Sequence, residues 1–207
     1  MVLLNNPLVL LYGGTFNPIH FGHIKPVISL KKSISIKELL YIPCHIPPHK
    51  KAPKLSATQR LNMTVDAIRE TNFPFPVKVS DFELGSIEPS YSLKTILHFK
   101  TVYPDNDLGF LMGLDSLLSF TQWYKWQEIL ENCYLVVMTR PGFNLNDSNL
   151  APEITEQIGR RVFTISCEDV PVSSTMIREV IDGKAPIETI EAFLPESTKR
   201  YVIECSE

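Results

Sequence analysis

The sequence predicts an α/β protein with a doubly wound, mostly parallel β-sheet. Short, continuous apolar runs recur along the chain, as is typical of strands buried on both faces of a sheet. Stretches with helical periodicity separate these runs, and such alternation indicates a parallel sheet covered by helices. The length of 207 residues suits one domain. We therefore expect a single domain over residues 1–207, with a small C-terminal helical part from about residue 173.

The chain opens with a strand and a helix. Residues 8–12 (LVLLY) form an uninterrupted apolar run, and the Gly13-Gly14 pair ends it. A helix-like stretch follows over residues 21–32. Because Pro26 lies beyond the first turn of that stretch, we expect a late helix start or a kink.

A second strand and a capped helix come next. The short apolar run at residues 39–42 (LLYI) predicts the strand, whereas the proline-rich residues 43–55 predict an irregular loop. Ser56 and Gln59 have the spacing of a capping box, which begins a helix that runs to about residue 71.

The second half of the chain continues the alternation. Its expected elements are a helix after Ser90, a strand over 108–112 ended by Gly113, a helix over 126–132, strands over 134–138 and 162–165, and a helix capped by Ser173 and ended by Gly183. In sheets of this kind ligands bind beyond the carboxyl ends of the strands. The loops that follow the strands are therefore the expected place of the functional site.

Charge and composition exclude several classes of function. Twenty Lys and Arg against 23 Asp and Glu give a net charge of −3, so bulk charge predicts neither a nucleic-acid nor a membrane partner. Residues 1–12 lack the basic region of a signal peptide, and no apolar run reaches about 18 residues. We expect a soluble protein of the cytoplasm, whose reducing conditions suit four cysteines that are far apart: Cys44, Cys133, Cys167 and Cys205.

The loop after the first strand reads GGTFNPIHFGH over residues 13–23. Paired glycines let the backbone approach a ligand, and the N-terminus of the following helix favours an anion. His20 and His23 share one face of the helix start, and Gly22 leaves room between them. Each of these residues alone would fit an ordinary turn, but their combination favours a phosphate site. The string matches neither the dinucleotide-binding Gly-x-Gly-x-x-Gly motif nor a Walker loop.

This loop resembles that of the His-x-Gly-His nucleotidyltransferases and, among them, the bacterial nicotinate-nucleotide adenylyltransferases, in which Asp stands at the position of Asn17. The resemblance covers nearly the whole chain. Further segments that are similar in order and spacing are PCHIPPHK at 43–50, Ser90-Tyr91-Ser92 with Thr95, Gly113-x-Asp115, Trp123-Tyr124, Arg140-Pro141-Gly142, Ser173-Ser174-Thr175-x-Ile177-Arg178 and Leu194-Pro195.

The resemblance implies a Rossmann-like nucleotidyltransferase fold that transfers AMP from ATP to nicotinate mononucleotide in NAD biosynthesis. It implies Mg²⁺ carried mainly by the ATP phosphates, and catalytic roles for His20, His23, Lys50 and Arg178. The residues that it assigns to ATP are Gly13, Gly14, Thr15, Phe16, His20, His23, Gly113, Asp115, Arg140, Ser173, Ser174, Thr175 and Arg178. Those that it assigns to nicotinate mononucleotide are Tyr91, Ser92, Asp115, Trp123 and Tyr124.

Some of these residues also have plainer interpretations. Lys50 could lie on a solvated loop, and Arg178 could be a surface arginine on a capped helix. Asp115 could bond ribose hydroxyls or cap the next helix. We assign Trp123 to the pyridine ring and Trp126 to packing. Residues that we expect to have no site role are Asp81, Glu83 and Glu88, taken as solvated, and Cys44, His45 and His49, which lack the second cluster that a metal site needs.

The alternatives left open are of two classes. One is an adenylyltransferase that prefers nicotinamide mononucleotide (NMN) or another small metabolite. The other is a non-catalytic sensor domain that binds nucleotides. The sequence leaves the oligomeric state open.

Overall fold

The computed structural model describes residues 6–46, 53, 55–85, 89–143 and 149–206. Its centre is a six-stranded sheet in the order β3-β2-β1-β4-β5-β6, in which every neighbouring pair is parallel. The strands are β1 (Leu8–Gly14), β2 (Ile36–Pro43), β3 (Val77–Val79), β4 (Leu108–Gly113), β5 (Tyr134–Thr139) and β6 (Val162–Ser166). The predicted doubly wound α/β architecture is confirmed.

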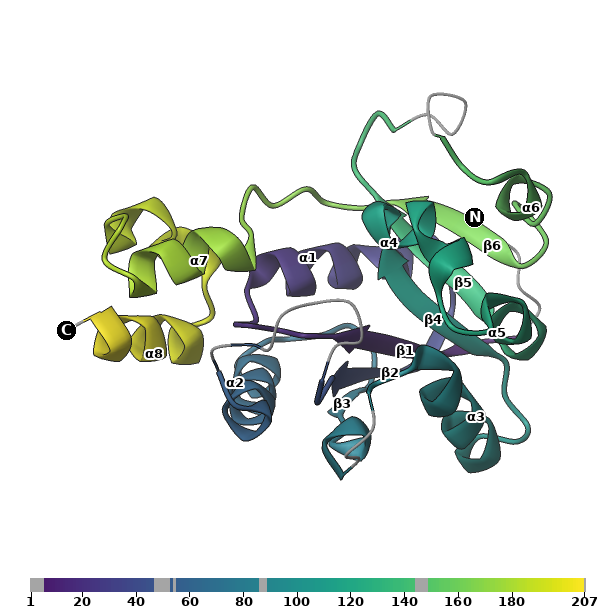
Figure 1. Cartoon of the computed structure of the whole chain (residues 1–207), viewed down its shortest axis with the longest axis horizontal. Coiled ribbons are helices and arrows are strands. Elements are labelled where there is room, and N and C mark those ends of the chain that lie inside the picture. The colour runs from purple at the N-terminus through teal and green to yellow at the C-terminus, as the bar shows by residue number, and fades with distance from the viewer. Residues whose placement is uncertain (1–5, 47–52, 54, 86–88, 144–148, 207) are drawn as a thin grey trace.

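Two apolar layers lie on opposite faces of this sheet, because successive side chains of a strand point to opposite sides. In β1, Leu8, Leu10 and Tyr12 join one layer, while Val9 and Leu11 join the other. The first layer packs under α1 (Phe21–Ser29) and α2 (Ala57–Arg69). The second packs under α3 (Ser92–Val102), α4 (Leu114–Leu118), α5 (Trp126–Asn132) and α6 (Pro152–Thr155). Helices therefore cover both faces of the sheet (Figure 1).

The strand order reverses between β1 and β4. Both β2 and β3 lie on one side of this boundary, and β5 and β6 lie on the other. Loops that leave β1 and β4 therefore diverge, which opens a crevice at their carboxyl ends. The Gly13-Gly14 pair ends β1 and Gly113 ends β4, so the glycines singled out in the sequence lie at this point.

A separate helical part follows the sheet. It contains α7 (Ser174–Ile181) and α8 (Glu196–Ser206), which lie together at one end of the molecule (Figure 1). Gly183 ends α7 with a φ of +69°, the left-handed conformation that favours glycine. This part has its own buried apolar cluster: Ile177, Val180, Ile190, Leu194 and Val202.

Several elements differ from the expectation. The first helix begins at Phe21 and passes through Pro26, so the expected late start is wrong; a single 3₁₀ turn at Leu30–Lys32 ends it. Strand β3 was not predicted because three residues of VKV at the sheet edge give no continuous apolar run. The short helices α4 and α6 also escaped prediction, since each spans about one turn. None of the described helices is long and apolar enough to cross a membrane.

Candidate active site

The glycine-rich loop is shaped by Phe16. A Cβ atom on Gly14 would lie 2.7 Å from the ring of Phe16, whose side chain is buried. Phe16 itself has a φ of +44°, a conformation that costs energy for a bulky residue. Gly14 therefore leaves the room that the buried ring of Phe16 occupies against the backbone of the loop.

Both histidines of the loop use Nδ1 as an acceptor. His20 is the N-cap of α1, and its Nδ1 accepts the backbone N–H of Gly22 at 3.1 Å. The Nδ1 of His23 accepts the N–H of His20 at 3.3 Å. Each neutral imidazole therefore carries its proton on Nε2, where it is a hydrogen-bond donor. A Cβ on Gly22 would lie 2.8 Å from the ring of His20, which explains the glycine between them.

The two imidazoles differ in exposure. Their rings lie 3.8 Å apart, but His20 is only 4% exposed. Burial lowers the pKa of His20 from 6.5 to about 4, so this ring is neutral at pH 7. His23 lines two of the cavities described below, whereas His20 is not among the described lining residues.

Helix α7 brings its first turn onto the same loop. The hydroxyl of Ser174 donates to the main-chain oxygen of Pro18 at 3.1 Å. The Nη2 of Arg178 donates to Thr175 Oγ1 at 2.8 Å. Ser173 acts differently, because its hydroxyl is the N-cap of the helix and accepts the N–H of Met176. The late motif and the first loop, far apart in sequence, thus form one surface.

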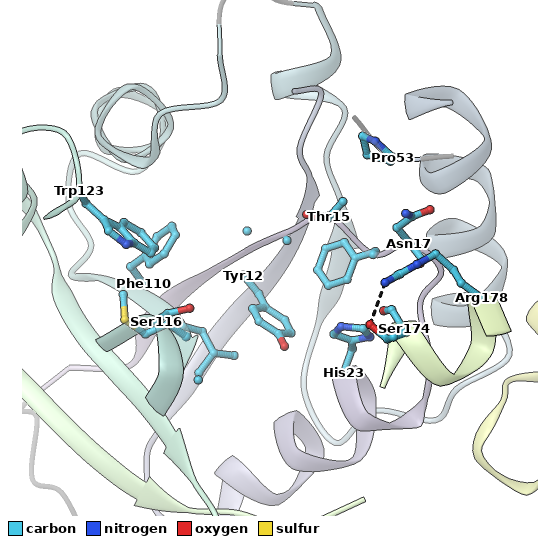
Figure 2. A pocket seen from close by; sticks show the side chains of 17 residues that line it. Tyr12, Thr15, Asn17, His23, Pro53, Phe110, Ser116, Trp123, Ser174 and Arg178 are labelled. Atoms are coloured by element: carbon cyan, nitrogen blue, oxygen red, sulfur yellow. Dashed lines mark hydrogen bonds between the residues drawn. The ribbon is translucent and has the colours of Figure 1, made fainter. Parts of the chain in front are cut away.

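The central cavity has a volume of about 560 Å³ and lies between this surface and β4. Figure 2 shows Arg178, Ser174 and His23 on one side of it and Trp123 with Phe110 on the other. Its described polar side chains are hydroxyls, an amide, an imidazole and one guanidinium, and they include no carboxylate. Such a lining suits an anion. The predicted residues that it brings together are Gly13, Gly14, Thr15, Phe16, His23, Gly113, Trp123, Ser174, Thr175 and Arg178.

A smaller cavity of about 270 Å³ adjoins the central one and shares Gly13, Gly14 and Trp123 with it. We call it the ring-side cavity. It brings together the predicted residues Tyr91, Ser92, Trp123 and Tyr124. The rings of Tyr91 and Tyr124 lie 4.9 Å apart. Trp126 packs on Phe120 with 6.2 Å between ring centroids and lines none of these cavities among the described residues.

A third cavity, of about 800 Å³, adjoins the central cavity on its other side and shares Tyr12, His23 and Gly113 with it. Asp115 and Arg140 line it, and Arg140 pairs with Asp169 at 3.4 Å. The N-cap of α4 is Gly113, and Asp115 lies in the first turn, so the alternative of Asp115 as a helix cap is wrong. Asp115 thus lies beside Gly113 and Arg140, which the resemblance assigns to ATP, and is not among the described residues that line the ring-side cavity.

Two buried charged residues near the site were missed. Arg60 is 1% exposed and donates to the main-chain oxygens of Thr15 at 2.7 Å and His45 at 3.1 Å. Glu83 is 8% exposed and lines the ring-side cavity, so the expectation that it is solvated is wrong. The partners of both lie on other segments of the chain, and no local sequence signal marks them. Asp81, in contrast, is exposed as expected.

Other predicted residues fall outside the described part of the chain: Lys50, His49 and Glu88. Within the described residues, no group of three or more His, Cys, Asp or Glu side chains could hold a metal ion.

Comparison with known proteins places these features in a family. The cytidylyltransferase-like family model matches residues 11–180. The probable nicotinate-nucleotide adenylyltransferase of Shewanella pealeana is 36% identical over 203 residues, which cover 92% of this chain and 90% of that protein. A protein of the same name from Shewanella putrefaciens is 36% identical over 201 residues, covering 86% and 90%.

Solved structures share the fold at lower identity. The nicotinic acid mononucleotide adenylyltransferase of Plasmodium falciparum, complexed with NaAD, has a TM-score of 0.75 at 18% identity, with 96% of each chain covered. The crystal structure of a Vibrio parahaemolyticus protein named "putative nicotinate-nucleotide adenylyltransferase" has a TM-score of 0.63 at 20% identity, covering 96% of this chain and 99% of that one.

Proposed function

The chain belongs to the cytidylyltransferase-like family and, within it, to the nicotinate-nucleotide adenylyltransferases, and from this membership we propose that it transfers AMP from ATP to nicotinate mononucleotide. The products are nicotinate adenine dinucleotide and pyrophosphate. The reaction is a step of NAD biosynthesis.

One structural observation supports this proposal above the others. Three adjoining cavities lie at the point where the strand order reverses, and the middle one has an anion-binding lining. The ring-side cavity offers aromatic surfaces to a pyridine ring, and the third cavity, at about 800 Å³ against about 270 Å³, has more room for the adenosine group of ATP. Two nucleotides bound in this way would bring their phosphates together in the central cavity.

The proposed chemistry is a single in-line displacement. An oxygen of the 5′-phosphate of nicotinate mononucleotide attacks the α-phosphorus of ATP. The bond from that phosphorus to the bridging oxygen breaks, and pyrophosphate leaves with the electron pair. No covalent enzyme intermediate is needed, so catalysis consists of positioning and charge stabilisation.

The residues of the central cavity have distinct proposed roles in that step. His23 would donate from Nε2 to a phosphate oxygen as negative charge develops. Arg178 would neutralise the departing pyrophosphate, with Ser174 and Thr175 donating beside it. His20, buried against His23, would fix that ring through its backbone N–H. Lys50 is proposed as a second cation for pyrophosphate, on the resemblance of the string Pro-Pro-His-Lys.

The donor set of the central cavity fits a magnesium ion that arrives with the nucleotide. Mg²⁺ prefers oxygen ligands and keeps several waters, and the described lining offers hydroxyls and an amide but no carboxylate. The ATP phosphates would therefore be its main ligands, with the hydroxyl of Thr15 available as a neutral oxygen. When bound, the ion lowers the negative charge of the phosphates.

We further propose that residues 1–207 act as one domain in the cytoplasm. The hydrogen bonds of Ser174 and Arg178 to the first loop support a single functional unit. Four free cysteines, three of them buried, suit the reducing conditions of that compartment.

The proposed function is tested by measuring pyrophosphate release from ATP with three acceptors: nicotinate mononucleotide, NMN and phosphopantetheine. We expect kcat/KM for nicotinate mononucleotide to exceed that for NMN by at least ~100-fold. A carboxylate accepts hydrogen bonds from two N–H groups, whereas a carboxamide turned toward them leaves buried donors mispaired.

Two other results would each point elsewhere. Equal kcat/KM for nicotinate mononucleotide and NMN would favour an NMN-type enzyme. If the protein binds ATP but releases no pyrophosphate in the presence of any of the three acceptors, the result would favour a non-catalytic sensor domain.

A further inference from the structure

A buried carboxyl group lies in the wall of the ring-side cavity. Glu83 is 8% exposed, and its Oε1 accepts the hydroxyl of Thr95 at 2.6 Å. Thr95 is itself only 1% exposed. Burial raises the pKa of Glu83, while hydrogen bonds from Thr95 and Ser90 act in the opposite direction. Burying a carboxyl group is costly, so its presence beside a binding cavity calls for a function.

The hydrogen bonds of Glu83 hold both sides of the segment that lines this cavity. Ser90 precedes Tyr91 and Ser92, and Thr95 follows them within one turn of α3. The hydroxyl of Ser90 bonds Glu83 and also accepts the N–H of His45 at 3.1 Å. The N–H of Ser90 donates to the oxygen of Ile46 at 3.0 Å. The direction of the backbone at Tyr91 and Ser92 therefore depends on where Glu83 lies.

This network continues to the central cavity through Arg60. His45, whose N–H reaches Ser90, gives its main-chain oxygen to Arg60 at 3.1 Å. Arg60 also binds the oxygen of Thr15 at 2.7 Å. A buried guanidinium and a buried carboxyl group are thus joined through the segment that follows β2. The two loops that line the ring-side cavity are therefore connected through Glu83 in its wall and Arg60 beside it.

We propose that Glu83 is a positioning residue for the pyridine ring of the mononucleotide substrate, acting through Ser90 and Thr95 on the backbone of Tyr91 and Ser92. The inference rests on the proposed function. Glu83 lines the ring-side cavity and is not among the described residues that line the other two. Its removal should therefore affect the ring substrate and leave ATP almost untouched.

The test is steady-state kinetics of Glu83→Gln with both substrates varied. Gln has nearly the same size and can still accept the hydroxyl of Thr95, but its NH₂ group then faces Ser90, whose hydroxyl loses the acceptor that the carboxyl now provides. A mispaired buried group of this kind weakens binding about tenfold or more. We expect KM for nicotinate mononucleotide to rise about tenfold or more, KM for ATP to change less than about twofold, and kcat to change less than about threefold. The matched control is Asp81→Asn, which removes the same charge from an exposed side chain two residues away.

A second variant keeps the proposal testable if Glu83→Gln fails to fold. Thr95→Val keeps the shape of the side chain, leaves Glu83 in place and removes one of its donors. We again expect KM for nicotinate mononucleotide to rise and KM for ATP to stay nearly unchanged. In the double variant that combines Glu83→Gln with Thr95→Val, the two effects should not add, because the two side chains are in contact.

Two outcomes would overturn the proposal. An equal rise of both KM values would indicate a general structural role. An unchanged or lower KM for the ring substrate would show that Glu83 does not position it. Wild-type protein is assayed with nicotinate mononucleotide and NMN in parallel. If it prefers NMN, the proposed function fails, and the comparison between ring substrate and ATP still tests Glu83.

Discussion

Arg178 donates a hydrogen bond of 2.9 Å from Nη1 to the main-chain oxygen of Asn17, which lies 161 positions earlier in the chain. A second bond from Nη2 reaches Thr175 Oγ1 at 2.8 Å. The planar guanidinium makes the two bonds from two nitrogens held in a fixed geometry, which the single nitrogen of an ammonium group does not reproduce. The same side chain lines the central cavity. Arg178 therefore joins the last motif to the first loop at the place where phosphates are proposed to bind.

Arg178→Lys should retain the charge and lose the fixed geometry. We expect kcat to fall about tenfold or more, since positioned donors to developing charge contribute on the order of 10²–10³ in rate. Initial-rate measurements of pyrophosphate release check this. Arg160→Lys is the matched control, because Arg160 is exposed and lines none of the three cavities. Wild-type kcat in Arg178→Lys would show that a positive charge at this position is sufficient and that the fixed geometry of the guanidinium does not contribute to the rate.

His23→Ala should lower kcat by at least ~10²-fold, because it removes an Nε2–H donor from the wall of the central cavity. Single-turnover rates measure the effect on the chemical step. Circular dichroism and thermal unfolding establish that the variant is folded. His98→Ala serves as the control, because His98 lies on α3 and not on α1. Its ring stacks on Phe82 with 3.9 Å between the ring centroids. Near wild-type turnover in folded His23→Ala would contradict the proposed phosphate contact.

Asn17→Asp should change kcat by less than about tenfold. Arg178 binds the main-chain oxygen of Asn17 and not its side chain, so the tie between α7 and the first loop survives the substitution. The Oδ1 of Asn17 is buried and accepts no hydrogen bond from the described residues, so no existing side-chain contact is lost when Asp replaces Asn. Steady-state kinetics at fixed Mg²⁺ measure the change. An Asp form hundreds of times faster would mark the wild-type site as degenerate.

The stability of the protein should fall as the pH drops from 6.5 to 4, in part through His20. The pKa of His20 is about 4 in the folded chain against 6.5 ordinarily, so the unfolded chain binds the proton more readily over that interval. The stabilisation from neutral His20 is complete above pH 6.5 and is lost as the pH falls toward 4. The difference amounts to about 3 kcal/mol. Urea unfolding at pH 7 and pH 4.5 measures it.

The variant His20→Asn isolates this contribution, because Asn keeps an N-cap acceptor and does not titrate in this range. Its free energy of unfolding should depend less on pH than that of the wild type. An identical pH dependence in both proteins would show that His20 is not the group responsible.

The fold could be predicted from the sequence because the central strands β1, β4 and β5 are buried on both faces and therefore mostly apolar. The runs at residues 8–12, 108–112 and 134–138 predict β1, β4 and β5 to within two residues of their ends. The site is predictable where its residues are contiguous, as in the loop of His20 and His23. The hydroxyls of Ser174 and Thr175 belong to a second contiguous motif.

The site residues that could not be predicted from the sequence depend on contacts between distant segments of the chain. Arg60 looks like any polar residue of an amphipathic helix, and only the fold shows that the oxygens of Thr15 and His45 surround it. Glu83 lies in a charged, polar stretch that reads as solvated, yet α3 covers it through Thr95. Exposure likewise distinguishes His20 from His23, although the sequence presents them as equivalent.

The late position of Arg178 in the chain has a consequence for synthesis on the ribosome. A nascent chain that has emerged as far as Ser166 contains all six strands of the sheet. It still lacks Ser174, Thr175 and Arg178, which complete the central cavity. The apolar layers can therefore form before the growing polypeptide acquires its full affinity for nucleotides. Translation that stops short of α7 would release a chain with every strand of its sheet and an incomplete phosphate site.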